Sequence, residues 1–265
     1  MTHLQTPATN GSATGGTLPR LRQQDLLKML RVNDPQGVAS LGGRIVTAEP
    51  RAQLVSAGLD GSTAGVLLSG WACRSAYLPN GRRQIVDVLL PGDLFGLEAA
   101  VLGRSEHVVM ALSEASFQSF DAGRLRERLM SKPQLAFGVI GFLLNEQHRQ
   151  NQHIVSLGRC RAEERMARFM LGLRARLTDR GMVPTNSFRL PLTQQEIADH
   201  LGLTVVHVNR VLRSLREAGA LTLRDRTVRI GNLDRLSLLA APLEDIPEPT
   251  VPRFNGGSSN DATIR

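Results

Sequence analysis

The stretch QQEIADHLGLTVVHVNRVLR, residues 194–213, decides the fold of the C-terminal third of this chain. A helix-turn-helix needs a small residue where its helices cross, a glycine that can adopt a positive φ in the turn, and apolar residues at fixed inward offsets. Ala198 supplies the small residue and Gly202 the turn. The inward-facing apolar positions are Ile197, Leu201, Leu203, Val208 and Val211.

Capping residues stand at the start of both predicted helices. Thr193 and Glu196 have the Ser/Thr-x-x-Glu spacing of a capping box, and Thr204 can cap the second helix. The alternative is a pair of amphipathic helices in an ordinary core, which would match only part of this pattern. The matched positions together with the caps favour the helix-turn-helix.

Short strand patterns flank this motif. Residues 220–230 predict two strands around Arg224-Asp225-Arg226, and residues 188–191 can supply a third. The combination predicts a winged helix-turn-helix domain over residues 159–240. This third of the chain holds 15 arginines and 8 acidic residues, which gives it most of the net charge of +8. A basic surface that coincides with a helix-turn-helix is suited to neutralising DNA phosphates.

The composition agrees with a folded protein that has a polyanionic partner. The chain has 265 residues, of which 42% are hydrophobic and 21% charged, so collagen, a disulfide mini-protein and a wholly disordered chain are excluded. Lys28 and Lys132 are the only lysines, so arginine supplies almost all the positive charge. No stretch approaches the roughly 18 to 20 apolar residues of a membrane helix, and no signal peptide begins the sequence, which predicts a cytoplasmic protein.

Residues 21–132 precede the long helical pattern and predict a sensor-like domain. A short helix is expected between residues 21 and 32, and short β-branched runs broken by Gly, Pro, Asn and Asp from 44 to 120 predict an antiparallel β barrel or roll. A short helix is expected over residues 122–130. Residues 1–20 and 246–265 are rich in small and polar residues and predict disordered tails.

Residues 133–158 predict a long helix with a heptad seam. The positions of this seam, most of them apolar, follow one another at alternating spacings of three and four residues over three repeats, which favours a two-stranded parallel dimer. Val139, Leu143 and Val155 lie off the seam and are expected to pack on the β domain. The alternative is one amphipathic helix that covers the core of its own chain. The predicted interface residues are Phe137, Ile140, Leu144, Gln147, Asn151 and Ile154.

Together these segments resemble the CRP/FNR family of bacterial transcription regulators, named for the cyclic-AMP receptor protein and the fumarate and nitrate reduction regulator. The segments that carry the resemblance are LLSGWACRSAYLPNGRRQIVDVLLPGDLFG, the long helix, RAEERMARFMLGL and LTQQEIADHLGLTVVHVNRVLRSLREAGAL. The resemblance covers residues 40–238. It implies an α+β architecture: an N-terminal antiparallel β roll of the jelly-roll, cyclic-nucleotide-binding type, a dimerisation helix, and a C-terminal winged helix-turn-helix. It also implies a homodimer on an inverted-repeat operator, with RNA polymerase as a partner.

The resemblance maps the DNA-reading positions of the family onto Val206, Asn209 and Arg210. The family commonly has Glu, then Ser or Gly, then Arg there, so Arg210 fits and Val206 departs. Arginine can bond O6 and N7 of guanine, whereas valine offers only apolar contact, for instance to a thymine methyl. The residues expected at DNA are Thr193, Gln195, Thr204, Val205, Val206, His207, Asn209, Arg210, Arg213, Arg224 and Arg226.

The expected ligand pocket of the family is incomplete here. The resemblance implies a Gly-Glu pair and, about ten residues on, an Arg, but Glu98 comes one place late and His107 stands at the second position. Arg104 would reach the pocket only through a connection shortened by three residues. A buried phosphate without a guanidinium partner is poorly compensated, so cyclic-AMP binding is disfavoured.

Other cofactors and signals follow from the cysteines and histidines. The two cysteines, Cys73 and Cys160, form no cluster, and residues 1–40 lack cysteine, which disfavours the iron–sulfur branch of the family. Haem stays open, with His107, Cys73 or a residue of the tails as ligand, although a lone histidine is more often a surface or core-edge residue. Cys160 lies between Arg159 and Arg161, whose charges favour a reactive thiolate, so it is a candidate redox residue; most such cysteines are only small buried residues.

The sequence thus predicts a DNA-binding regulator and not an enzyme. No Gly-rich phosphate loop, His-Glu-x-x-His or Gly-x-Ser-x-Gly motif occurs, and no segment between the tails is left for a catalytic domain. A haem- or small-ligand-gated member of the same family is the first alternative. A regulatory subunit that does not bind DNA is the second.

Overall fold

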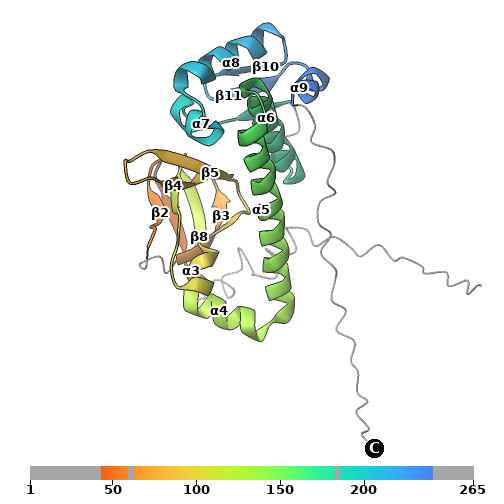
Figure 1. Ribbon diagram of the computed structural model, residues 1–265. Coiled ribbons are helices and arrows are strands. Elements are labelled where there is room, and N and C mark those ends of the chain that lie inside the picture. Colours follow the sequence, from red (N-terminus) through yellow and green to blue (C-terminus); the bar gives the residue numbers. More distant parts are fainter. Residues whose placement is uncertain (1–42, 59–62, 183–185, 241–265) are drawn as a thin grey trace, which may run out of the picture.

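The computed structural model describes residues 43–58, 63–182 and 186–240. Figure 1 shows an N-terminal β roll, one long helix beside it, and a C-terminal helical half with a small sheet. The predicted α+β class is confirmed. The helix expected between residues 21 and 32 and both predicted tails lie outside the described residues.

The roll consists of two four-stranded antiparallel sheets. Their strand orders are β1-β8-β3-β6 and β2-β7-β4-β5. Apolar residues of both sheets meet between them, including Phe95 and Phe117, whose rings pack edge to face at a centroid distance of 5.6 Å. The strands are β1 (Ile45–Ala48), β2 (Gln53–Val55), β3 (Thr63–Ser69), β4 (Ala72–Tyr77), β5 (Arg83–Leu89), β6 (Leu94–Phe95), β7 (Val108–Ala111) and β8 (Ala115–Asp121).

Three helices cover the β1-β8-β3-β6 sheet. The first, α3 (Leu97–Leu102), was not expected from the sequence; it starts at Gly96, where φ is 67° and an added Cβ would lie 2.2 Å from the Thr63 carbonyl oxygen. Only glycine fits there. Next come α4 (Ala122–Ser131), capped by Asp121, and α5 (Pro133–Arg159).

The long helix α5 has two apolar faces. Leu135, Val139 and Phe142 are buried in a cluster with β3, β6 and β8, so the helix does cover the core of its own chain. The apolar residues of the predicted seam are exposed on the described chain, from 42% for Phe137 and Leu144 to 64% for Ile154. The structure therefore confirms that one face of α5 covers the core of its own chain, and the dimer seam on the other face stays a prediction.

Two residues of α5 do not lie where the sequence placed them. Leu143 and Val155 were expected to pack on the β domain, but their side chains are 43% and 41% exposed. The reason is helical phase: Leu143 lies about 40° around the helix from the buried Val139 and about 60° from the seam residue Ile140, so it falls between the two faces. It therefore borders the seam instead of facing the roll as Val139 does.

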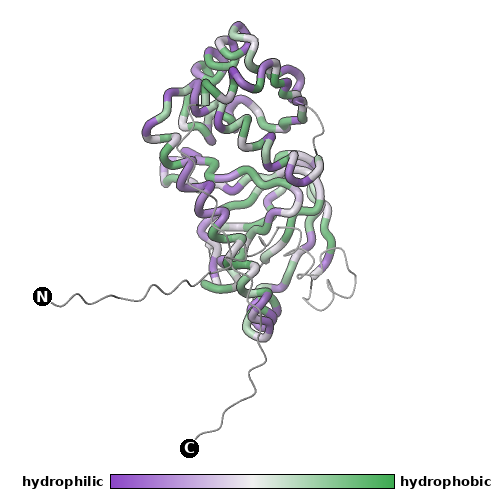
Figure 2. The backbone as a smooth tube through the Cα atoms, turned by 90° about the vertical axis from the view of Figure 1, so that its right-hand side faces the viewer, coloured by the Kyte–Doolittle hydropathy of each residue, from purple (hydrophilic) through white to green (hydrophobic). Residues whose placement is uncertain are grey.

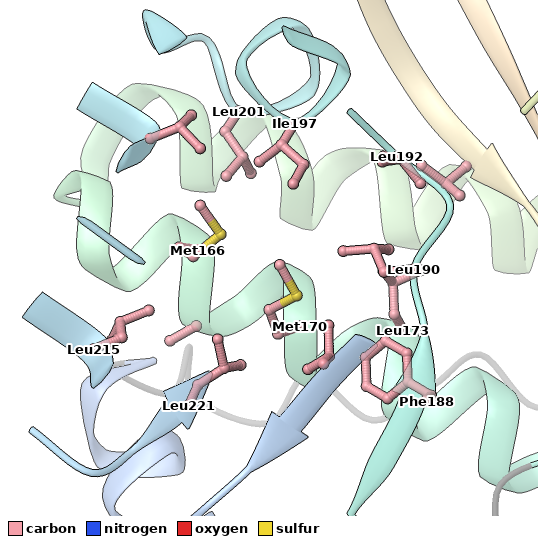
Figure 3. Packing of buried hydrophobic residues seen from close by; sticks show 14 of the residues in the cluster. Met166, Met170, Leu173, Phe188, Leu190, Leu192, Ile197, Leu201, Leu215 and Leu221 are labelled. Carbon is pink, nitrogen blue, oxygen red and sulfur yellow. The ribbon is translucent and has the colours of Figure 1, made fainter. Parts of the chain in front are cut away.

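The C-terminal half is built around α6 (Ala162–Asp179). Met166 and Met170 of α6 are fully buried beneath the other helices and the small sheet, whose strand order is β10-β11-β9 (Figure 3). The helix α9 was not expected from the sequence. The elements are β9 (Ser187–Arg189), α7 (Gln194–Leu201), α8 (Val205–Glu217), β10 (Leu221–Arg224), β11 (Thr227–Ile230) and α9 (Leu233–Leu239).

Ion pairs and hydrogen bonds dock the C-terminal half on the roll. Asp93, fully buried in the turn after β5, accepts hydrogen bonds of 2.6 Å from both Arg176 and Arg180. Burial opposes the charge of this carboxylate, but the two guanidinium groups prevail and hold its pKa well below the usual range. Arg83 of β5 bonds Asp199 of α7 at 2.8 Å. The two halves thus form one packed unit in this arrangement.

Hydrophilic and hydrophobic residues alternate along the helices in Figure 2. Among the described helices, none has the length and the apolar character needed to cross a bilayer.

Candidate DNA-binding surface

The helix-turn-helix has the geometry that its sequence predicts. The Thr193 hydroxyl accepts from the Glu196 amide at 3.2 Å, and the Glu196 carboxylate accepts from the Thr193 amide at 2.7 Å, which completes the capping box. Gly202 ends α7 with a φ of 63°. The Thr204 hydroxyl caps α8 by accepting from the His207 amide at 3.2 Å. These contacts fix the start of α8 relative to α7.

The helix α8 presents two opposite stripes. Val208, Val211 and Leu215 are buried against the core, which leaves the other side of the helix exposed. The helix itself lies near the top of Figure 1. The exposed stripe follows the spacing i, i+3, i+4, i+7 of one helical face. Its members are Val206, Asn209, Arg210 and Arg213, continued by Arg216. Val206 is 70% exposed, an unusual apolar residue on a surface otherwise polar and positive.

Three of the residues expected at DNA make contacts within the chain instead. Val205 precedes Val208 by three residues, so it is half-buried and packs against the core. The Thr193 hydroxyl is bonded within the capping box, and the Gln195 amide donates to Asp199 at 2.7 Å. Thr204 and His207 are exposed at the start of α8.

The wing is a hairpin with a two-residue loop. Asp225 and Arg226 have φ angles of 48° and 56°, which is the backbone of the turns that match the twist of a hairpin. Arg224 and Thr227 pair directly before and after this loop. Arg224 and Arg226 are both exposed, so the loop presents two guanidinium groups beyond the sheet.

The sheet register reveals a row of arginines that the sequence analysis missed. Arg189 pairs with Thr227, and Arg229 lies two residues further along β11, so these side chains share the face of the sheet that Arg224 also occupies. The opposite face holds the buried Phe188 and Val228. Alternation of arginine with apolar residues in 187–189 and 227–230 was the signal that could have identified this face.

The exposed arginines of this surface are available for an external partner. Among the described residues, no carboxylate lies within ion-pair distance of Arg210, Arg213, Arg216, Arg224 or Arg226. By contrast, the arginines at the junction with the roll are paired with carboxylates. The surface formed by α8 and the wing therefore concentrates uncompensated positive charge. This arrangement suits a helix in the major groove with phosphate contacts on either side.

The expected ligand position in the roll is occupied by contacts within the chain. Glu98 accepts a hydrogen bond from the Ser105 hydroxyl at 3.2 Å and lies 3.8 Å from the His107 ring. Burial raises the pKa of Glu98, but His107, Arg74 and Ser105 outweigh it and lower that pKa to about 2. Arg104 points to Glu106 on the surface, so it does not reach the pocket.

A buried arginine does lie inside the roll, but α5 engages it. Arg74 of β4 is 3.5 Å from the Glu146 carboxylate of α5 and donates to the Leu94 carbonyl. The described residues thus offer no unpaired guanidinium at the expected phosphate position.

The candidate haem and redox residues differ in their burial and in their partners. Cys73 is completely buried, and burial raises the pKa of its thiol. His107 is half-exposed and faces Glu98. Groups of three or more metal-ligating side chains are absent from the described part of the chain. Cys160 is partly exposed where α5 ends, and its carbonyl accepts from Arg165 at 3.1 Å; a redox role for this thiol stays a prediction.

Known proteins share both halves of this architecture. Residues 45–132 match the model of the cyclic nucleotide-binding domain, and residues 164–239 match the Crp-like helix-turn-helix domain. The nitrogen fixation regulation protein FixK of Bradyrhizobium diazoefficiens is 35% identical over 168 residues, which cover 62% of this chain and 68% of that protein. The fumarate and nitrate reduction regulatory protein of Salmonella typhimurium is 30% identical, over 63% of this chain and 66% of its own length.

Solved structures agree with the sequence matches. FixK2 from Bradyrhizobium japonicum superposes with a TM-score of 0.67 at 26% identity, covering 76% of this chain and 98% of that one. A CooA mutant from Carboxydothermus hydrogenoformans superposes with a TM-score of 0.63 at 19% identity, over 81% and 95% of the two chains, which supports the fold alone.

Proposed function

Because this chain belongs to the CRP/FNR family of DNA-binding transcription regulators, we propose that it binds an inverted-repeat operator as a homodimer. It is a transcription regulator and not an enzyme, and it binds DNA through its helix-turn-helix domain. The observation that carries the finer proposal is the exposed stripe of α8, which sets Arg210 and Arg213 opposite the buried stripe.

We assign different tasks to the residues of this surface. Arg210 bonds O6 and N7 of one guanine, and Val206 makes an apolar contact, for instance with a thymine methyl. Asn209 lies between them on the same stripe. Arg224 and Arg226 at the wing bond phosphates, and the residues at the start of α8, Thr204 and His207, position the helix at the groove. Val206 sets the base pair at which the half-site departs from the usual family pattern.

The homodimer would form through the exposed seam of α5. A soluble chain rarely leaves a row of large apolar residues such as Ile140, Leu144 and Ile154 uncovered along a helix. A second copy packed in parallel would cover the row and leave the polar Asn151 to fix the register. The twofold axis would then place the two copies of α8 in successive major grooves, about 34 Å apart.

The cellular setting follows from this function. The chain would act in the cytoplasm, where the DNA is, with RNA polymerase as its protein partner.

A map of the sites that the protein occupies across the genome tests the proposal: occupied sites should share an inverted repeat. Occupied sites without a shared repeat would contradict it.

The wing arginine Arg224 should contribute affinity without sequence preference. We expect Arg224→Ala to weaken binding to operator and to scrambled DNA alike and to reduce the slope of log affinity against log salt by about one, because one phosphate contact is lost. Fluorescence anisotropy at several salt concentrations measures both quantities. Arg126→Ala, which removes another exposed arginine, from α4, is the matched control and should change neither. A loss confined to the operator would contradict the phosphate assignment.

Cyclic AMP should leave the regulator unchanged. We expect operator affinity to change by less than about twofold at millimolar cyclic AMP, because a ligand with no differential affinity for two conformations cannot shift their populations. Arg74 and Arg104 are both engaged by carboxylates of the chain itself. Calorimetric titration measures binding directly, and saturation at micromolar cyclic AMP would overturn this expectation.

A further inference from the structure

A cavity of about 150 Å³ lies where the roll, the long helix and the DNA-binding half meet. Its walls come from β5, from α5 near its end, from α6 and from the end of α7, which converge at the centre of Figure 1. Its size corresponds to the space of about five water molecules. The cavity is distinct from the ligand position of the roll near Glu98, and it does not open on the exposed stripe of α8.

Arginine dominates the polar lining. Arg149 of α5 and three arginines of α6, Arg165, Arg168 and Arg176, line the cavity, and Asp87 is the one carboxylate among the described lining residues. Two further carboxylates lie behind the wall: Asp93 bonds Arg176 at 2.6 Å, and Glu146 stands 3.6 Å from Arg149. Even so, guanidinium groups outnumber the carboxylates that face the space itself.

Several donor atoms in this wall are buried without a hydrogen bond. The Nε and one Nη of Arg149, the Nε of Arg176 and the Nε2 of His153 have no hydrogen-bond partner within the described part of the chain. By contrast, Arg165 is used twice, by the Cys160 and Leu201 carbonyls. Buried donors normally have partners, so these atoms indicate that something polar belongs in the space.

Two stacked histidine rings form another wall. His153 of α5 and His200 of α7 stack at a centroid distance of 4.2 Å with 5° between their planes. His200 donates its Nδ1 hydrogen to the Ile85 carbonyl at 3.0 Å, and burial lowers the pKa of both rings, which keeps them neutral. A neutral His153 adds no charge to the lining, and its Nε2 has no hydrogen-bond partner among the described residues.

We propose that this cavity binds a compact oxyanion, the phosphate group of a small molecule, held chiefly by Arg149 with His153 beside it. A phosphate accepts paired hydrogen bonds from a guanidinium, and the Nε and one Nη of Arg149 make no hydrogen bond among the described residues, although this Nη lies 3.6 Å from Glu146 Oε1. Because the walls come from both halves of the chain, the bound anion strengthens their docking. The site goes beyond the DNA-binding function, and its test contains no DNA.

The test is a titration of the full-length protein with inorganic phosphate at constant ionic strength, with chloride as the compensating salt. We expect a saturable rise of the melting temperature and a calorimetric stoichiometry of one phosphate per chain. Glycerol phosphate and succinate form parallel arms. Tighter binding of glycerol phosphate than of phosphate identifies a phosphate ester as the occupant, and the reverse identifies free phosphate. Saturation by succinate alone, or by none of the three, would overturn the proposal.

Two variants locate the site. Arg149→Gln should weaken phosphate binding about tenfold or more, because a charge-assisted bond pair is lost, whereas Arg159→Gln, an exposed arginine on the same helix, should bind within about twofold of the wild type. Gly172→Leu keeps every arginine, and apart from the adjacent residues and the nearby helix backbone no described atom lies within 4 Å of the Cβ that it adds. Its side chain should fill the cavity and abolish the phosphate response in a folded protein. Unchanged binding in both Arg149→Gln and Gly172→Leu would refute this location.

Discussion

Leu144→Glu should convert the regulator into monomers that no longer hold its operator. In the proposed dimer each copy would bury Leu144 against the other copy. Burying a leucine stabilises an interface by about 1.5 to 3 kcal/mol per side chain. Two glutamates at the seam would replace both contributions with repulsion. We expect the dimer dissociation constant to rise by about 100-fold or more and operator affinity to fall with it. Ile140→Glu should behave in the same way.

Sedimentation velocity combined with anisotropy checks this expectation. Leu143→Glu is a sharp control, because Leu143 is as exposed as its neighbour Leu144 but borders the seam, where charged residues are common in dimeric coils. It should leave the dimer largely intact. Equal dissociation by both variants would mean that the seam is misplaced, and a wild-type monomer bound to one half-site would contradict the dimer itself.

Arg210→Ala should remove sequence preference at one base pair. A bidentate contact between arginine and guanine contributes about 1 to 3 kcal/mol of discrimination, so operator affinity should fall between about fivefold and 150-fold. Binding to scrambled DNA should change much less, since the contact with a base edge exists only at the correct site. Competition between the operator and variants at each G·C pair measures the effect.

The comparison with Arg224→Ala separates the two kinds of contact. Loss of Arg210 should relax specificity, whereas loss of Arg224 should weaken all DNA equally. If Arg210→Ala discriminated operator from scrambled DNA as well as the wild type does, α8 could not be the element that recognises the bases in the way proposed.

The helix-turn-helix could be predicted in detail because its determinants are local. A capping box, a glycine at positive φ and a stripe of apolar residues all act within a few turns of chain, so Thr193, Gly202 and Val208 have the roles that their spacing predicts. The wing could be predicted from two short strand patterns because a hairpin is also a local structure.

Features that depend on distant contacts could not be predicted. The helix α3 exists because Gly96 approaches Thr63 on another strand, and six residues carry too little periodicity to reveal it. Leu143 was assigned to the wrong face because several faces of α5 are apolar, and only packing distinguishes the buried one. Val205 was expected at DNA, but it lies three residues before the buried Val208 and packs against the core.

The arginine-lined cavity shows the same limit. Arg149 and His153 share one face of α5 at the spacing i, i+4, but Arg176 lies far from them in sequence and no motif connects it to them. The three residues line one cavity only when α5 and α6 pack against β5. The same docking brings Arg176 and Arg180 into ion pairs with Asp93, which lies in a turn.

In vitro selection of random double-stranded DNA by the purified full-length protein reveals whether two recognition helices read one operator. We expect enrichment of an inverted repeat whose half-site centres are one helical turn apart, about 10 to 10.5 base pairs, with a G·C pair in each half-site that Arg210→Ala no longer selects. Enrichment of no sequence, or of single half-sites without an inverted partner, would contradict it.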